Sequence, residues 1–273
     1  MTGAPTTHSR APFAQRTFSA VTLTFLGVYA LFIVALIWGT ANFSSLGAVL
    51  HALSSREVLF AIKLSLITST ATSMLSVLVG LPAAYALSRH RFPGKALIDT
   101  LIDLPVVLPP IAAGVALLAF FKSAPGGLIE HFTGDLAFTP QGIVLAQFTV
   151  VSALGVRVLK SAFDSLDPRY ERVARTLGFS QWQAFRKIVL PLSSRAIIAA
   201  AVMTWARAMG EFGATIIFCG ATSFRTEVLS IAIFLNMAVA DLDSALAITL
   251  ILMLISLSAL LLFKRFGERT VVV

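Results

Sequence analysis

Apolar residues in this chain are gathered into long runs that short polar segments separate. Because a helix needs about 20 mostly apolar residues to cross a bilayer, with a range of roughly 17–25, each run of that length predicts a membrane span. Six runs qualify, so the pattern predicts an all-α, polytopic membrane protein with six transmembrane helices. They cover residues 18–38, 64–87, 104–121, 141–163, 196–220 and 244–263.

Composition supports a membrane protein and excludes a soluble globular domain. The 273 residues are 57% hydrophobic and 12% charged, whereas soluble domains average about 45–50% apolar and about 25% charged residues. The first run is longer than the roughly 7–15 residues of a signal-peptide core, and no cleavage signal follows it. We expect a retained anchor behind a short disordered leader at residues 1–15, and a transmembrane domain over residues 16–270.

One further apolar segment, residues 226–240, is too short to span a bilayer. A seventh span at this place would move the basic C-terminus to the other side of the membrane. The sequence therefore predicts an interfacial or re-entrant piece on the outer side.

Basic residues are distributed unevenly between the two sides of this topology. If the N-terminus is cytoplasmic, sixteen of the 21 Lys and Arg residues fall in cytoplasmic segments and four in outer segments. Because an excess of Lys and Arg in cytoplasmic loops sets orientation, we expect both termini in the cytoplasm. The net charge of +8 then reflects orientation, and no nucleic-acid partner is expected.

Residues for metal or cofactor chemistry are sparse. The chain has one cysteine and four histidines that lie far apart, so no metal site is expected. It lacks the G-x-x-x-x-G-K-[ST] phosphate loop, so it cannot hydrolyse ATP alone. No nucleophile with a neighbouring base stands near a membrane face. The sequence predicts neither an enzyme nor a resident cofactor.

The polar segment between spans four and five, residues 164–194, carries the signals of two short helices. Asp167 followed by Pro168 predicts a helix start, with Pro168 at the first helical position, and Gly178 predicts the helix end. Apolar residues then recur on one face: Tyr170, Val173, Ala174 and Leu177.

The second helix of this segment begins at Ser180, which forms a capping box with Gln183, and ends at Leu190-Pro191. Its apolar face holds Trp182, Phe185 and Ile188. Two such helices along the membrane surface would give another protein a surface to bind. The alternative is a loop whose Arg and Lys side chains meet anionic lipid headgroups.

Two charged residues, Arg207 and Glu211, fall inside the fifth span, where each costs about 2.5–3.5 kcal/mol on insertion scales. Their i, i+4 spacing lets them pair on one helix face. The pair either fixes helix packing, with Gly210 and Gly213 allowing close approach, or lines a pore in which Arg207 meets a passing anion.

Prolines and hydroxyl residues are the other features of the spans. Pro105, Pro109 and Pro110 predict a kink or unwound turn in span three, with packing and gating roles both open. Thr215 is a candidate for contact with substrate. A group of hydroxyl residues in span two either bonds within the bundle or lines a path: Ser65, Thr68, Ser69, Thr70, Thr72, Ser73 and Ser76.

The polar segment at 164–194 also resembles a known family motif. Arg172-Val173-Ala174, three residues, Gly178, nine residues and Ile188-x-Leu190-Pro191 resemble the EAA loop of ABC transporter permeases, E-A-A-x3-G-x9-I-x-L-P. Arg172 stands where the motif has Glu, and Glu171 is displaced by one position. The resemblance implies coupling helices that dock on a separate ATP-hydrolysing subunit. The residues that would carry this coupling are Glu171, Arg172, Ala174, Gly178, Ile188, Leu190 and Pro191.

Further stretches are similar to molybdate permeases and, less closely, to sulfate permeases. They read A-R-A-M-G-E-F-G-A-T-I at 206–216, R-F-P-G-K-A-L at 91–97 and L-P-V-V-L-P-P at 104–110. The resemblance covers about residues 56–263 and implies the fold of a type I ABC importer permease, acting as a homodimer with the pathway along its twofold axis. The candidate pathway residues are Arg207, Glu211, Thr215, Pro109 and Pro110.

The resemblance implies the transmembrane subunit of an ATP-driven oxyanion importer in a prokaryotic inner membrane, with molybdate as the first candidate substrate. Its partners would be a second copy of the chain, a cytoplasmic ATP-binding subunit that uses the ATP, an extracytoplasmic oxyanion-binding protein and membrane lipid. A permease for sulfate, thiosulfate or tungstate is one alternative. A secondary transporter driven by an ion gradient is another.

Overall fold

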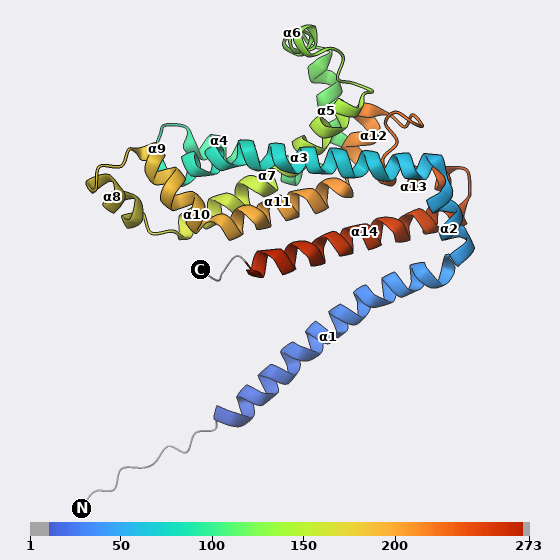
Figure 1. Cartoon of the computed structure of the whole chain (residues 1–273), viewed down its shortest axis with the longest axis horizontal. Helices are drawn as coiled ribbons and strands as arrows, with labels where there is room; N and C mark the ends of the chain where they lie inside the picture. Colours follow the sequence, from blue (N-terminus) through green and yellow to red (C-terminus); the bar gives the residue numbers. More distant parts are fainter. Residues whose placement is uncertain (1–10, 270–273) are drawn as a thin grey trace, which may run out of the picture.

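The computed structural model describes residues 11–269, and within that range the chain is helical, with no strand. Helices α3, α7, α11 and α14 pack side by side as the body of the molecule (Figure 1). The all-α fold predicted from the apolar pattern is confirmed. In chain order the helices are α1 (Ala11–Phe43), α2 (Leu46–Ser54), α3 (Arg56–Arg89), α4 (Lys95–Val107), α5 (Pro110–Phe121), α6 (Ala124–Thr133), α7 (Pro140–Ser165), α8 (Arg169–Thr176), α9 (Gln181–Ala184), a π-helical turn (Phe185–Val189), α10 (Leu190–Leu192), α11 (Ser194–Met209), α12 (Gly213–Cys219), α13 (Leu229–Ala238) and α14 (Leu242–Arg269).

Four described helices are long and apolar enough to cross a membrane, and two bent helix pairs raise the possible number of spans to six. The four contain the first, second, fourth and sixth expected spans, and each helix is longer than the apolar run that predicted it. They are Thr17–Phe43, Arg56–Arg89, Pro140–Ser165 and Leu242–Phe263. The other two expected spans are not continuous helices.

The third expected span, residues 104–121, is broken. Helix α4 ends at Val107, α5 begins at Pro110, and the two helices meet at 116°. The break follows from the sequence, because Pro109 has no amide hydrogen and the residue before a proline avoids helical geometry. Leu108 is accordingly extended, with ψ 133°. As a result, α5 and α6 project sideways from the bundle (Figure 1).

The fifth expected span, residues 196–220, is also interrupted. Helix α11 ends at Met209 and α12 begins at Gly213, so residues 210–212 are not helical. At its other end, α11 meets the preceding segment, Gln181–Leu192, at 71°. The apolar run at 196–220 thus forms two helices, and side-chain contacts at the interruption replace some of the helical backbone bonds.

Small and hydroxyl residues let α3 pack closely against α7 and α11. Thr72 Oγ1 donates to Gln147 Oε1 at 2.9 Å, and Ser73 Oγ donates to the Ala201 carbonyl at 2.7 Å. Bonds of this kind hold helices together in membranes. The hydroxyl residues that α3 buries are Ser65, Thr68, Ser69, Thr72, Ser73 and Ser76.

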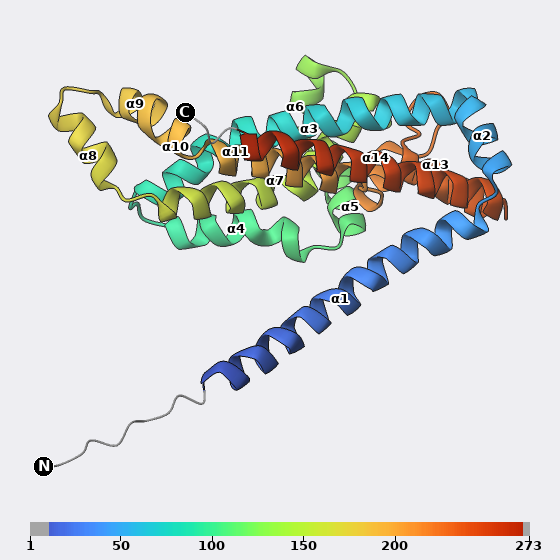
Figure 2. The same cartoon turned by 60° about the horizontal axis from the view of Figure 1, so that its bottom comes forward.

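Helix α1 diverges from the bundle and contacts α14 (Figures 1 and 2). None of the residues in its most apolar window is buried inside the chain. Residues 11–15, expected in a disordered leader, already belong to this helix. Residues 1–10 of that expected leader lie outside the described residues.

The two ends of the bundle carry different elements. Helices α8 and α9 lie at one end, and α2 and α13 lie at the other (Figure 1). The apolar segment 226–240 forms α13, which packs against α14 and α3. Its 10 residues are too few to span a bilayer, as predicted.

Candidate functional site

The breaks in the third and fifth spans lie against one another. A Cβ atom on Gly213, at the start of α12, would stand 2.9 Å from Pro110 Cβ and 3.0 Å from the Ile111 amide nitrogen. One turn into α5, a Cβ on Gly114 would stand 2.9 Å from the Ala214 carbonyl oxygen. Only glycine fits at these two contacts. Irregular backbone at membrane depth is tolerated where protein or a water-filled cavity satisfies it, so the junction is a candidate functional site.

An ion pair stands at this junction. Arg207, in the last turn of α11, pairs with Glu211 just beyond the helix, with 2.7 Å between Nη1 and Oε2. The pairing predicted from the i, i+4 spacing is confirmed. The Glu211 side chain is 1% exposed, whereas that of Arg207 is 41% exposed. Glu211 thus holds the guanidinium from the protein side, and part of the Arg207 side chain remains exposed.

Glu211 also explains why the helix breaks here. Its Oε1 accepts a hydrogen bond from the Ala214 amide at 3.1 Å, inside the first turn of α12. Its carbonyl oxygen accepts from Ser230 Oγ at 2.8 Å. These bonds satisfy backbone groups that the interruption frees. One buried carboxylate therefore caps α12 and pairs with the last charged residue of α11.

Arg207 lies on an open face of α11. Met203, Arg207 and Gly210 follow one another at helical spacing, and all three are exposed. Trp205 and Met209, on the opposite face, are buried. A cation on an open helix face beside two broken helices is an arrangement that can attract an anion.

The other predicted pathway residues have different surroundings. Pro109 is exposed and Pro110 is half-buried, both at the junction. Thr215, expected to touch a substrate, is instead fully buried, and its hydroxyl has no hydrogen-bond partner among the described residues. Thr215 therefore packs inside the chain in this structure.

The predicted coupling loop, residues 164–194, begins with α8, which starts at Arg169, one residue later than predicted. Gly178 has the left-handed φ of +89° that a helix-ending glycine adopts. Its amide bonds the Arg175 carbonyl, and the Phe179 amide bonds the Ala174 carbonyl, both at 3.1 Å. These two bonds form a Schellman motif, so the predicted end of the first helix is confirmed.

The second helix of the loop starts with the predicted capping box. The Gln183 amide donates to Ser180 Oγ at 3.2 Å, and the Ser180 amide donates to Gln183 Oε1 at 2.8 Å. The helix was expected to end at Leu190-Pro191, but it continues to Leu192. A π turn at Phe185–Val189 widens the helix just before Pro191, which relieves the clash of a proline ring with the preceding turn.

Large apolar side chains of the loop point outward at the end of the molecule. Tyr170 is 57% exposed, Val173 58%, Leu177 74% and Trp182 64%. Ala174 is buried, so the predicted apolar face is divided between the two sides of α8. Arg172 and Pro191 are exposed, while Ile188 and Leu190 are half-buried. Exposed apolar residues gathered in this way are typical of a protein-contact surface.

Glu171 faces the opposite way, toward the end of α3. Its Oε1 lies 2.7 Å from Arg89 Nε, and its Oε2 accepts from Tyr85 Oη at 2.6 Å. Arg89 and Tyr85 were not predicted as functional residues, because no sequence pattern links them to a residue more than 80 positions away.

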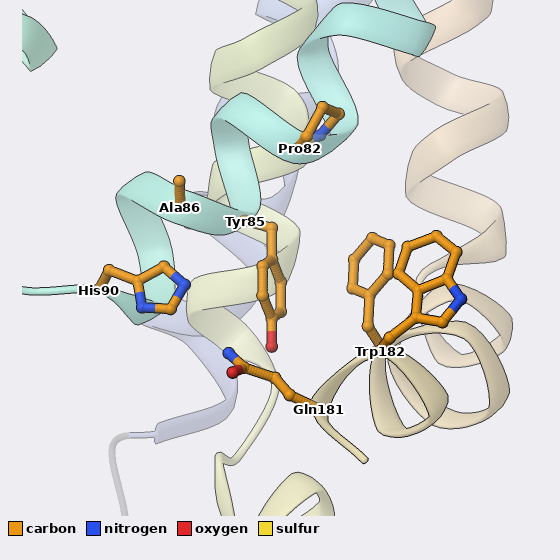
Figure 3. Close-up of a pocket in the computed structure, with 7 residues that line it drawn as sticks. Pro82, Tyr85, Ala86, His90, Gln181 and Trp182 are labelled. Atoms are coloured by element: carbon orange, nitrogen blue, oxygen red, sulfur yellow. The ribbon is translucent and has the colours of Figure 1, made fainter.

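A hollow of about 490 Å³ opens beside this contact, between the end of α3 and α9 (Figure 3). A second hollow of about 330 Å³ continues past Glu171, Arg172 and Arg175. The Tyr85 ring stands between α3 and Gln181 at the edge of both hollows (Figure 3). The first hollow is lined by Pro82, Tyr85, Ala86, His90, Gln181, Trp182 and Phe185.

A further ion-pair group, also missed in the sequence, ties α4 to α7. Arg157 Nη1 lies 2.7 Å from Asp99 Oδ1, and the same guanidinium pairs with both carboxylate oxygens of Asp103. The four-residue spacing of the two acids on α4 is the one signal that they share a helix face.

A helical bundle that crosses the membrane several times, with paired helix breaks around a buried ion pair and a structured loop at one end, defines a multi-pass membrane transport protein. The chain belongs to the family of binding-protein-dependent transport system inner membrane components, whose family model matches residues 76–272. It is therefore an ABC transporter permease of the oxyanion subfamily, with the type I importer permease fold.

Known relatives agree with this assignment. The chain is 36% identical over 229 residues to the sulfate transport system permease protein CysT of Escherichia coli, covering 81% of this chain and 82% of the relative. It is 34% identical over 251 residues to a probable molybdenum ABC transporter permease of Haloferax volcanii, covering 92% and 91%. A bacterial alginate ABC transporter, crystallised with an alginate-bound periplasmic protein, shares the fold with a TM-score of 0.74, at 17% identity over 94% of this chain and 95% of that chain.

Proposed function

We propose that this chain is the transmembrane subunit of an ATP-driven importer for a tetrahedral oxyanion, with molybdate as the first candidate. The observation that carries the proposal is the family match over residues 76–272, which includes both the coupling loop and the Arg207–Glu211 junction. Relatives named as sulfate and molybdenum permeases support an oxyanion substrate.

The junction has the chemistry that such a substrate needs. A dianion in a low-dielectric pathway requires hydrogen-bond donors and positive potential, and the half-exposed Arg207 guanidinium offers both. Glu211 keeps the net charge of the site near zero, so a passing anion is attracted without being held tightly. In a homodimer, the twofold axis would bring two copies of this pair to one pathway.

The loop at residues 164–194 would couple transport to the ATP-binding subunit. Its outward apolar residues, above all Leu177 and Trp182, offer a docking surface to an ATP-binding subunit on the cytoplasmic side. That subunit would bind and hydrolyse the ATP. An extracytoplasmic binding protein would deliver the oxyanion to the opposite end of the bundle, and lipid or the second copy would cover α1.

The test is transport by the complete complex in proteoliposomes. Arg207→Ala removes the donors and the positive charge, so we expect uptake of labelled molybdate to fall by about tenfold or more. Arg207→Lys keeps the charge and should retain part of the activity. Met203→Ala, one turn earlier on the same open face, is the matched control and should transport normally. Normal kinetics for Arg207→Ala in a correctly assembled complex would leave Arg207 with a packing role alone.

The same assay separates the alternative functions. Uptake that follows an ion gradient and ignores ATP would identify a secondary transporter. Competition by sulfate, thiosulfate and tungstate against molybdate ranks the oxyanions, and titration of the binding protein with each anion locates the selectivity.

A further inference from the structure

We propose that Tyr85, Arg89 and Glu171 form a mechanical joint through which the coupling loop moves helix α3. Glu171 is then a positioning residue inside the chain, and it is not a contact for the ATP-binding subunit. This inference rests on the proposed function, because it requires that the loop receives the motion of such a subunit.

The joint is a closed set of charged and polar contacts. Arg89 Nε donates to Glu171 Oε1 at 2.7 Å, and Tyr85 Oη donates to Glu171 Oε2 at 2.6 Å. Both carboxylate oxygens therefore have partners on α3. The side chains of Arg89 and Glu171 are 12% and 13% exposed, so water screens the pair weakly. Charge-assisted bonds of this length hold two elements in a fixed relation.

The same α3 residues hold other parts of the loop. Arg89 Nη2 donates to the Leu166 carbonyl at 2.9 Å, just before α8. The Tyr85 ring packs on Phe185 in the second half of the loop, with 4.6 Å between ring centroids. Two adjacent turns of α3 thus contact the loop at three places: before α8, within α8 and after α9.

Open space lies on both sides of these contacts. The hollows of about 490 Å³ and about 330 Å³ separate the end of α3 from α9 and from α8, and Tyr85 borders both (Figure 3). A push on α8 therefore reaches α3 through the bonded residues, whereas the second half of the loop also shares an apolar cluster with α3, in which Val189 lies with Ala84 and Leu87.

Helix α3 connects the joint to the junction with the ion pair. Gln147 on α7 accepts from Thr72 of α3 at 2.9 Å and donates to the Ala208 carbonyl at 3.1 Å. Ala208 is the neighbour of Arg207 in α11. A displacement of α3 is thus passed, by way of Gln147, to the backbone that carries Arg207.

The geometry assigns different tasks to two neighbouring loop residues. Glu171 is turned inward with both oxygens occupied, which leaves it little capacity for a second protein. Arg172, the next residue, is exposed. It is Arg172, and not Glu171, that stands at the acidic position of the EAA pattern and is free to meet another subunit.

The experiment compares Glu171→Ala, Arg89→Ala and Tyr85→Phe in the complete complex with its ATP-binding subunit and binding protein. We expect the ATP-binding subunit to co-purify with each variant. Molybdate uptake should fall by about tenfold for the two Ala variants, and the ATP hydrolysed per anion transported should rise, since the loop moves without α3. Tyr85→Phe keeps the ring packing and the fold, and it should raise the same ratio to a smaller extent.

Two further variants test whether the residues act through one another. The double variant Arg89→Ala with Glu171→Ala should be no worse than either single variant, because the contact is already lost. The exchange Arg89→Glu with Glu171→Arg should restore part of the uptake. Arg169→Ala, also on α8 but with an 80% exposed side chain, is the matched control and should keep the wild-type ratio.

Three outcomes are decisive. The joint would be overturned if Glu171→Ala kept wild-type uptake and the wild-type ratio of ATP hydrolysed to anion transported. Loss of the ATP-binding subunit from Glu171→Ala, with Arg89→Ala unaffected, would show that Glu171 is a docking contact and would also overturn it. Absence of ATP-driven uptake in the wild-type complex would instead overturn the proposed function.

Discussion

Two single residues, Gly178 and Glu227, stand at positions that constrain which side chain can be accommodated. Gly178 has a φ of +89°, where residues with a Cβ atom are strained. Glu227, between α12 and α13, is 5% exposed, and its Oε2 has no hydrogen-bond partner among the described residues. Each position gives a prediction.

Replacing Gly178 should weaken coupling through backbone strain and not through a clash, because nothing lies within 4 Å of a Cβ placed there. Gly178→Val should cost about 1–2 kcal/mol and misdirect the second helix of the loop, so uptake should fall. Gly178→Asn, which tolerates left-handed geometry better, is the matched control and should retain more uptake. Full-rate transport by an assembled Gly178→Val complex would contradict the coupling role of this turn.

Glu227 predicts a pH dependence of stability. Burial raises the pKa of Glu227 above its usual value, the nearby Glu57 carboxylate adds to the rise, and Ser223 opposes it. The folded state then binds more protons than the unfolded state, so stability is full below the usual Glu pKa of about 4.3 and falls as pH rises through the raised pKa.

Glu227→Gln removes this titration, and its melting temperature should exceed that of the wild type at neutral pH while the two converge in acid. Thermal melts of the purified chain in nanodiscs across this pH range provide the measurement. If the melting temperatures of the wild type and Glu227→Gln changed in parallel with pH, Glu227 would be excluded as the titrating group.

At the scale of elements, the meeting of α5 and α12 sets the geometry of the junction. Gly213→Ala would place a methyl group 2.9 Å from Pro110 Cβ and 3.0 Å from the Ile111 nitrogen, so the helices must separate. We expect a loss of about 1–3 kcal/mol in stability, seen as a lower melting temperature, together with reduced uptake. Gly127→Ala in α6, where nothing lies within 4 Å, is the control and should be neutral or stabilising. Equal melting temperatures for both variants would contradict the close approach.

The sequence was sufficient to predict elements whose signals are local. Long apolar runs predicted α1, α3, α7 and α14, and Gly178 and the Ser180 capping box predicted the helix ends in the loop. The prolines at 109–110 signalled a kink, but not a 116° turn that sends α5 out of the bundle. The break in span five depends on where Glu211 finds its partners. The contacts of Glu171 join residues far apart in sequence, and no local pattern carries that information.

At the scale of the whole molecule, orientation is the property that charge distribution predicts. The loop with α8 and α9 and the turn between α13 and α14 lie at opposite ends of the bundle (Figure 1). If basic residues set the topology, the first end is cytoplasmic and the second is extracytoplasmic.

The single native cysteine makes this orientation easy to measure, because Cys219 is fully buried and should not react with a thiol reagent. Exposed Ser180 and Asp241 mark the two ends. A membrane-impermeant maleimide applied from outside should label Asp241→Cys in intact spheroplasts, and should label Ser180→Cys after lysis alone. The reverse pattern would invert the topology.

The helix break before α5 lies against the break before α12, and this contact limits how the sequence of the protein can vary. Gly213 has no room for a side chain because Pro110 lies against it, and the start of α5 lies there because Pro109 ended the preceding helix. A substitution that straightened either helix would drive its backbone into the other. The two breaks should therefore be inherited together, and an engineer who wishes to graft this junction onto another bundle must transplant residues 108–114 and 210–214 as one unit.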